Sequence, residues 1–151
     1  MKDTDIAYLA GILDGEGCIH IKRNKRKDCP KGVQYQLGVT VRMSNESICQ
    51  LYQKYFGGRV YQCKKYKSYY KQLWQWIVTS KQASAFLRII LPYLIDKKTE
   101  AILGLKFQDA KMPIRAKMGH RGFISQPAEI VAIEESQYIL MKNLHNKSEA
   151  I

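Results

Sequence analysis

Residues 4–21 of the chain read TDIAYLAGILDGEGCIHI, and the spacing of their apolar side chains changes part-way along. Apolar residues first recur at the spacing of one helix face, and isoleucines then alternate with polar residues, the spacing of a half-buried strand. This change predicts a helix from Thr4, capped by Thr4 or Asp5, to about Leu13, and a strand over residues 18–27. An acidic side chain lies at the junction between the two elements.

The same two patterns alternate along the rest of the chain. Turn residues at 28–32 precede a regularly alternating strand at 34–43, while Gly57, Gly58 and Pro92 end or interrupt later helices. The later predicted elements are a helix at 46–56, a hairpin of strands at 59–65 and 70–78, helices at 80–91 and 96–111, a basic loop at 115–126 and a helix at 127–146. The order predicts a mixed α/β (α+β) fold in which antiparallel hairpins pack one apolar face on helices.

The composition fits one soluble, intracellular domain. The chain has 151 residues, of which 46% are hydrophobic and 25% charged, as is ordinary for a globular protein. We expect no membrane span and no cleaved leader, because there is no long apolar run and no signal pattern at the start. Cys18, Cys29, Cys49 and Cys63 form no closely spaced pair, which argues against a zinc site or a disulfide scaffold and favours a reducing compartment.

The charge balance favours a partner that is rich in phosphate. Lys and Arg number 25 against 13 Asp and Glu, which gives a net charge of +12 and a pI near 9.6. Between Cys18 and Thr79 only Asp28 and Glu46 are acidic. A ribosomal or membrane-surface protein would also be basic, but the near absence of acids from the predicted hairpins favours a nucleic-acid interface.

One face of each predicted hairpin carries side chains of the kinds that bond base edges and phosphates. A two-stranded ribbon fits the major groove of DNA, so these faces predict an antiparallel DNA-binding saddle, with an ordinary solvated sheet face as the alternative. Trp74 and Trp76 lie on the opposite face from Gln75 and are predicted to be core residues. The residues predicted to contact DNA are His20, Lys22, Asn24, Arg26, Gln34, Gln36, Thr40, Arg42, Tyr61, Lys65, Lys71 and Gln75.

Residues 9–17, LAGILDGEG, carry the most specific signal in the chain. All nine positions agree in kind with the LAGLIDADG signature, so the chain resembles the LAGLIDADG homing endonucleases in their single-motif form. The resemblance implies an αββαββα domain over residues 1–151, with a core at about 4–110 and a C-terminal helical extension at about 111–151. No second copy of the motif follows residue 20.

A single motif implies a homodimer, because a duplex has two strands to cut. Each chain would read half of a long pseudo-palindromic site, and the pair would make a double-strand cut. Gly11 and Gly15 lie four residues apart on one helix face, and such small-residue spacing permits close helix pairing. The dimer interface is expected at Leu9, Gly11, Ile12 and Gly15.

The resemblance also implies the catalytic residues. Glu16, helped by the Gly15 carbonyl, would hold Mg²⁺ (or Mn²⁺) beside a DNA phosphate, where the metal can activate water. Asn45 and Lys97 match the family's polar residue and lysine near the attacking water, although Lys98 is adjacent and a shift of one residue would exchange the two lysines. Lysine there would either bind phosphate or act on the water.

Several alternatives stay open. A DNA-binding regulator that has lost cleavage, or an RNA-splicing maturase with intron RNA as its partner, would keep the same fold. A basic ribosomal or RNA-chaperone protein would need neither metal nor a palindromic site. The resemblance and the composition, rich in Lys, Ile and Tyr, suggest an intron-encoded protein in the cytoplasm of a microbe or the interior of a chloroplast or mitochondrion.

Overall fold

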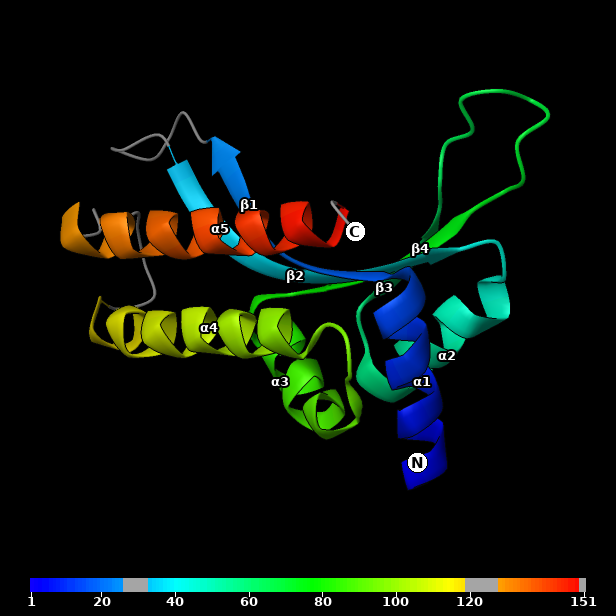
Figure 1. The fold of residues 1–151 in the computed structure, drawn as a ribbon, viewed down its shortest axis with the longest axis horizontal. Helices are drawn as coiled ribbons and strands as arrows, with labels where there is room; N and C mark the ends of the chain where they lie inside the picture. Colours follow the sequence, from blue (N-terminus) through cyan, green and yellow to red (C-terminus); the bar gives the residue numbers. More distant parts are fainter. Residues whose placement is uncertain (26–32, 119–127, 150–151) are drawn as a thin grey trace.

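The computed structural model describes residues 1–25, 33–118 and 128–149, and its elements follow the predicted order (Figure 1). The helices and strands are α1 (Asp3–Glu16), β1 (Gly17–Lys25), β2 (Val33–Met43), α2 (Glu46–Phe56), β3 (Arg59–Gln62), β4 (Trp74–Thr79), α3 (Ser80–Ile90), the 3₁₀ helix η1 (Leu91–Tyr93), α4 (Lys98–Met118) and α5 (Ala128–Glu149). The α+β fold is therefore confirmed. None of the described helices is long and apolar enough to cross a membrane.

The strands form one antiparallel sheet in the order β1-β2-β4-β3. β2 and β4 are central, and β1 and β3 are the edges. Ile19 lies opposite Val39 on β2, which in turn lies opposite Val78 on β4, and all three side chains are buried. One face of the sheet therefore belongs to the core, as the alternation predicted.

Aromatic side chains from three elements make the centre of the core. Tyr52 on α2 stacks on Trp76 of β4 with ring centroids 4.7 Å apart, and Phe86 of α3 meets Trp76 edge-on at 5.0 Å. The Trp76 indole donates to the Gly57 carbonyl over 2.8 Å, and the Tyr52 hydroxyl donates to the Leu9 carbonyl of α1. These bonds satisfy the polar ends of buried rings, and they tie α1 to the sheet.

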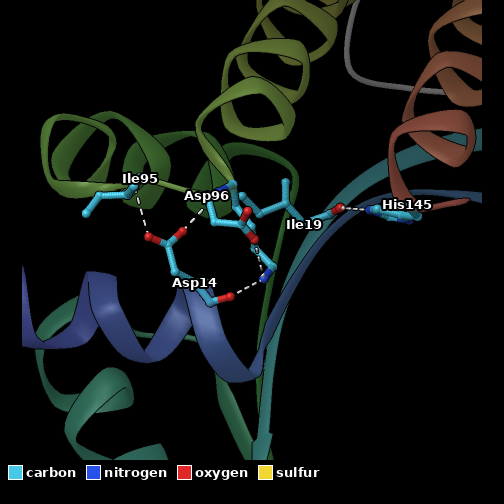
Figure 2. A network of polar contacts seen from close by, with 6 residues as sticks. Asp14, Ile19, Ile95, Asp96 and His145 are labelled. Atoms are coloured by element: carbon cyan, nitrogen blue, oxygen red, sulfur yellow. Dashed lines mark hydrogen bonds and ion pairs between the residues drawn. The ribbon is translucent and has the colours of Figure 1, made fainter. Parts of the chain in front are cut away.

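The C-terminal helix α5 packs beside α4 and against β1 and β2 (Figure 1). Its Tyr138 ring lies 5.6 Å from the Tyr35 ring on the core face of β2. Near its end, a ring nitrogen of His145 lies 2.9 Å from the Ile19 carbonyl of the edge strand β1 (Figure 2). An exposed strand edge invites pairing with other chains, so this helix protects the edge that β1 would otherwise present.

Some predicted boundaries were wrong. α1 begins at Asp3, because the Asp5 carboxylate accepts from the Lys2 backbone N–H over 3.0 Å and closes the first turn from inside the helix. α4 begins at Lys98 and runs to Met118, so the first residues of the predicted loop at 115–126 are helical.

The second hairpin also differs from the prediction. β3 and β4 are shorter than predicted, and residues 63–73 form a long loop that extends away from the sheet (Figure 1). Within this segment lysines and tyrosines follow one another without alternation, so no apolar face holds it on the core.

Candidate nucleic-acid interface and catalytic site

The end of α1 carries the acid that the motif singles out. Glu16 is the last residue of α1, its side chain is exposed, and β1 begins at the very next residue. A Cβ atom on Gly17 would lie 2.3 Å from Leu13 Cδ1 and 2.7 Å from the Leu13 carbonyl oxygen, so only glycine permits this abrupt change from helix to strand. The helix thus places Glu16 in solvent directly beside the sheet.

Asp14, the other acid of the motif, is bound within the chain. Its carboxylate accepts hydrogen bonds from the backbone N–H groups of Ile95 (2.8 Å) and Lys97 (3.0 Å), more than 80 positions later (Figure 2). These bonds fasten the segment before α4 to the end of α1. They are the contacts that a structural role for Asp14 requires.

Lys97 lies beside the end of α1. Its half-buried ammonium group donates to the Asp14 carbonyl oxygen and lies 3.8 Å from the exposed Asp96 carboxylate. The structure thus brings Lys97 to the end of the helix that carries Glu16. Neighbouring Lys98 is exposed and is the first residue of α4, so the contact with the motif favours Lys97 over the one-residue alternative.

Asn45 follows β2 and caps α2. Its carboxamide oxygen accepts from the Ser47 backbone N–H over 3.0 Å, while the side chain as a whole is exposed. The oxygen is therefore occupied, and the carboxamide NH₂ remains as a donor. That group can donate to a water or a phosphate oxygen, but it cannot accept a proton.

The exposed side of α1 includes two glycines. Gly11 and Gly15 are exposed, and a Cβ atom at either position would meet nothing within 4 Å. Ile12 is half-buried at the edge of this face. Leu9 is 0% exposed and packs in the chain's own core, while its place at a dimer interface stays a prediction. Ala7 and Tyr8, which the sequence analysis did not select, are exposed.

We call the sheet face opposite the core the polar face. Strand pairing places on it the residues predicted from β1, β2 and β4 together with one from β3: His20, Lys22, Asn24, Gln34, Gln36, Thr40, Arg42, Tyr61 and Gln75. None of the strands β1–β4 as described contains an Asp or Glu. Arg59, opposite Ile77 on β4, is exposed on the same face and was not predicted.

On the polar face, the imidazole of His20 lies over Gly38 of the neighbouring strand β2. His20 pairs with Gly38 in β2, and a Cβ atom at Gly38 would lie 2.6 Å from His20 Nε2. The glycine thus leaves room for the imidazole. Burial lowers the pKa of His20 below its usual 6.5, and the charges of His145 and Lys22 lower it further, while a hydrogen bond to the Cys18 backbone opposes them.

Two glutamines on the polar face already have partners within the chain. Gln36 Nε2 lies 3.2 Å from the Ser80 hydroxyl, and Gln75 Oε1 accepts two hydrogen bonds from Arg42. Gln75 is only 6% exposed. Its side chain therefore supports Arg42, and its selection as a direct DNA contact stays a prediction.

Two further predicted contacts lie off the sheet. Lys65 and Lys71 are exposed in the loop at 63–73, where Lys67 lies 5.5 Å from the Tyr69 ring centroid. They can reach a phosphate but hold no fixed register with the strands. Arg26 lies outside the described residues.

The donor set at Glu16 suits a magnesium ion that is shared with DNA. Among the described residues, no three His, Cys, Asp or Glu side chains gather to hold a metal. Glu16 is the free carboxylate, and the Gly15 carbonyl belongs to the last turn, where helix carbonyls lack intrahelical partners. Mg²⁺ usually binds through one or two carboxylates, retained waters and substrate phosphates, so the residues present fit it.

Solved structures share this arrangement of helices around an antiparallel sheet. The homing endonuclease I-CvuI in complex with its target superposes with a TM-score of 0.74 at 24% identity, covering 93% of this chain and 82% of that one. The archaeal intron-encoded homing endonuclease I-Vdi141I complexed with DNA gives 0.62 at 12%, covering 96% and 99%. I-SmaMI bound to cleaved DNA gives 0.68 at 16%, covering 89% of this chain but 42% of that one.

The sequence carries the family relationship as well as the fold. The family model of the LAGLIDADG endonucleases matches residues 9–111, more than half of the chain. The chain belongs to the LAGLIDADG endonuclease family. No curated protein matches it.

Proposed function

We propose that this protein is a site-specific homing endonuclease that acts as a homodimer and makes a metal-dependent double-strand cut in a long pseudo-palindromic DNA site. The observation that carries the proposal is the position of Glu16. It is exposed at the end of the motif helix and directly precedes the first strand of a polar face without acids. A carboxylate there is available to a metal beside DNA, whereas Asp14 is occupied by the backbone.

The dimer is supported by the open face of α1. Glycines at positions 11 and 15 leave the helix backbone accessible, and two copies could pack closely there about a two-fold axis. The chain also covers almost all of the I-Vdi141I chain but less than half of the I-SmaMI chain. One domain per chain supports the proposal that two chains pair, because the pair would then supply one Glu16 for each DNA strand.

Double-stranded DNA is the partner that the polar face suits best. The chain has a net charge of +12, and its four strands carry basic and amide side chains without acids. Phosphate contacts would position the duplex, while side chains at alternate strand positions would contact base edges in the major groove. A partner made of structured intron RNA would use charge in the same way but would not need the free carboxylate of Glu16.

Four residues of the chain would then share three tasks at the cut. Glu16 and the Gly15 carbonyl would hold Mg²⁺ or Mn²⁺, and a bound ion of this kind supplies water activation and charge neutralisation at a phosphate. The Lys97 ammonium, held by the Asp14 carbonyl, would stabilise negative charge on the phosphate. The Asn45 NH₂ group would donate to the attacking water and orient it, because its oxygen already caps α2.

The decisive experiment compares the parent with Glu16→Gln on a randomised pseudo-palindromic DNA library, with Mg²⁺ and with the metal chelated. We expect the parent to cut selected sites only with metal. Glu16→Gln should bind the same sites. Its cleavage activity should fall by more than about 10- to 100-fold, which is the decrease caused by losing a residue that only hydrogen-bonds to a metal ligand. Glu135→Gln makes the same chemical change on an exposed residue of α5 and should cut normally.

Other outcomes would redirect the assignment. If the parent binds selected DNA but never cuts it, the protein is a DNA-binding regulator or a maturase, and binding to structured intron RNA separates those two. If Glu16→Gln cuts as well as the parent does, Glu16 is not the metal ligand. If no DNA sequence is selected at all, the endonuclease proposal fails.

A further inference from the structure

Three residues form a transverse row on the polar face. Arg42 of β2 pairs with Gln75 of β4, which pairs with Tyr61 of β3, so the three side chains share one level across three strands. Arg42 and Tyr61 are exposed, whereas Gln75 between them is buried. The row therefore has a buried polar residue at its centre.

Arg42 contacts that central residue with one edge of its guanidinium. Its Nε and Nη2 groups both donate to Gln75 Oε1, over 2.9 and 2.7 Å. The guanidinium is planar and has five N–H donors in a rigid fork, so two bonds to one oxygen fix both the position and the plane of the group. The rotational freedom of a long side chain is thus removed before any ligand arrives.

The free edge of the guanidinium matches a particular base. With Nε–H and one Nη2–H occupied, the second Nη2–H and both hydrogens of Nη1 remain, and they point away from Gln75. Two parallel donors of this kind match the O6 and N7 acceptors of guanine in the major groove. We propose that Arg42 reads one guanine in each half-site and that Gln75 is a positioning residue that acts only through Arg42. This inference rests on the proposed DNA binding.

A glutamine is well suited to this task. A carboxylate at position 75 would hold the guanidinium equally well, but it would cancel the positive charge on a face whose strands, as far as they are described, contain no Asp or Glu. A neutral amide oxygen positions the arginine and keeps its attraction for DNA. Because Gln75 is 6% exposed, it makes this contact without reaching the base itself.

The experiment measures base preference at every position of the selected site for five variants. Arg42→Ala should remove the preference for guanine at one base pair in each half-site, a loss of about 5- to 150-fold in discrimination. Gln75→Met has a similar volume but no acceptor, and should weaken the same preference by about 2- to 12-fold, the effect of freeing one long side chain. Gln75→Glu should restore the preference while lowering overall affinity.

Gln36→Met is the matched control. It removes another polar-face glutamine, which is bonded to Ser80 and not to Arg42, and should leave the Arg42 base pair unchanged. The double variant Arg42→Ala/Gln75→Met should equal Arg42→Ala alone, because Gln75 acts through Arg42. Thermal unfolding of Gln75→Met checks that the buried position still folds.

The outcomes separate this inference from the proposed function. If the parent selects a site but Gln75→Met shifts the preference at a base pair that Arg42→Ala leaves unchanged, Gln75 reads a base directly and the inference is wrong. It is equally wrong if Gln75→Met folds and changes no preference. If the parent selects no site, the proposed function fails and this inference with it.

Discussion

Asp14 and Glu16 are two carboxylates on the same helix end, and their surroundings give them different tasks. Asp14 is fixed by two backbone N–H groups from the segment before α4, whereas Glu16 is exposed and has no partner of that kind among the contacts of the described residues. Hydrogen bonds to a charged group are among the stronger ones in a folded chain. We therefore assign stability to Asp14 and chemistry to Glu16.

Replacing Asp14 should destabilise the fold. Asp14→Ala removes the acceptor for two backbone N–H groups and should lower the free energy of unfolding by about 2–4 kcal/mol. Chemical denaturation checks this value. Asp96→Asn is the control, because Asp96 is 74% exposed and its ion pair with Lys97 should contribute little. Equal effects of the two changes would contradict the assignment.

His20 should make stability depend on pH. Its pKa in the folded chain is lowered, chiefly by burial, from the usual 6.5, and Lys22 and His145 are the charged groups that oppose its protonation. Between the lowered value and 6.5 the unfolded chain binds more protons, so stability should fall as pH decreases through this range. His20→Gln should reduce that fall, as denaturation curves measured at pH values above and below 6.5 would record. An unchanged pH dependence would exclude His20 as its source.

Much of the polar face could be predicted residue by residue, because a strand alternates its side chains between two faces. The same alternation cannot tell which polar residues bond one another. Gln75 was predicted to contact DNA because it alternates with Trp74 and Trp76 along the strand. Its contact with Arg42, however, depends on the pairing of β2 with β4. Leu9 is a related case, because spacing along a helix does not tell whether a leucine near a glycine face points inward or outward, and here it is buried.

Among the elements, α1 has an unusual composition for a helix, with two interior glycines on its exposed face. Glycine lowers helix stability relative to alanine, and here neither position is crowded within the chain. The glycines therefore cost the monomer some stability. The dimer interface proposed here explains why they are present.

Alanine at these positions should separate monomer stability from pairing. Gly11→Ala and Gly15→Ala should each stabilise the isolated chain by up to about 1 kcal/mol, while weakening the dimer by holding the helices apart. Unfolding at low concentration and sedimentation across a concentration series measure the two effects. Gly17→Ala is the contrasting variant, because its Cβ would clash with Leu13 and the fold itself should suffer. A dimer of undiminished affinity in Gly11→Ala and Gly15→Ala would place the interface elsewhere.

The elements themselves were predicted well where the pattern was regular. β2 alternates over its whole length and was found at Val33–Met43. The second hairpin was predicted too long, because β propensity in tyrosine-rich sequence does not reveal that a segment lacks core contacts. The extension of α4 past Lys111 was missed because Pro113 lies within it, and a proline in a helix interior usually ends or kinks the helix.

At the scale of the whole molecule, the charge of +12 should govern affinity through salt. Each phosphate contact that is lost should reduce the slope of log affinity against log salt by about 0.9. Lys65→Ala/Lys71→Ala removes two exposed lysines of the loop at 63–73 and should lower this slope without changing base preference. Arg42→Ala should alter base preference as well. Equilibrium binding over a salt series tests this, and a change in the selected sequence would show that the loop reads bases.

The fold as a whole could be predicted because the motif and the order of elements agree with each other. The sheet order could not be read from the sequence, since it depends on β4 pairing with β2 across the intervening α2 and β3. The cover that α5 provides over β1 was also not predictable in detail. A histidine 126 positions from its partner carbonyl leaves no local signal.

Because β1 begins directly after Glu16, the position of a residue in β1 would set the distance along the DNA between the cut and the base that the residue contacts. A strand advances about 3.3 Å per residue and DNA about 3.4 Å per base pair, so successive side chains of the polar face fall roughly two base pairs apart. β1 begins one residue after Glu16, and no linker between the two elements could change this spacing. Substituting side chains along β1 would therefore change which bases are preferred, while the distance from those bases to the cleaved bond stays the same. Only an inserted or deleted residue would move the cut.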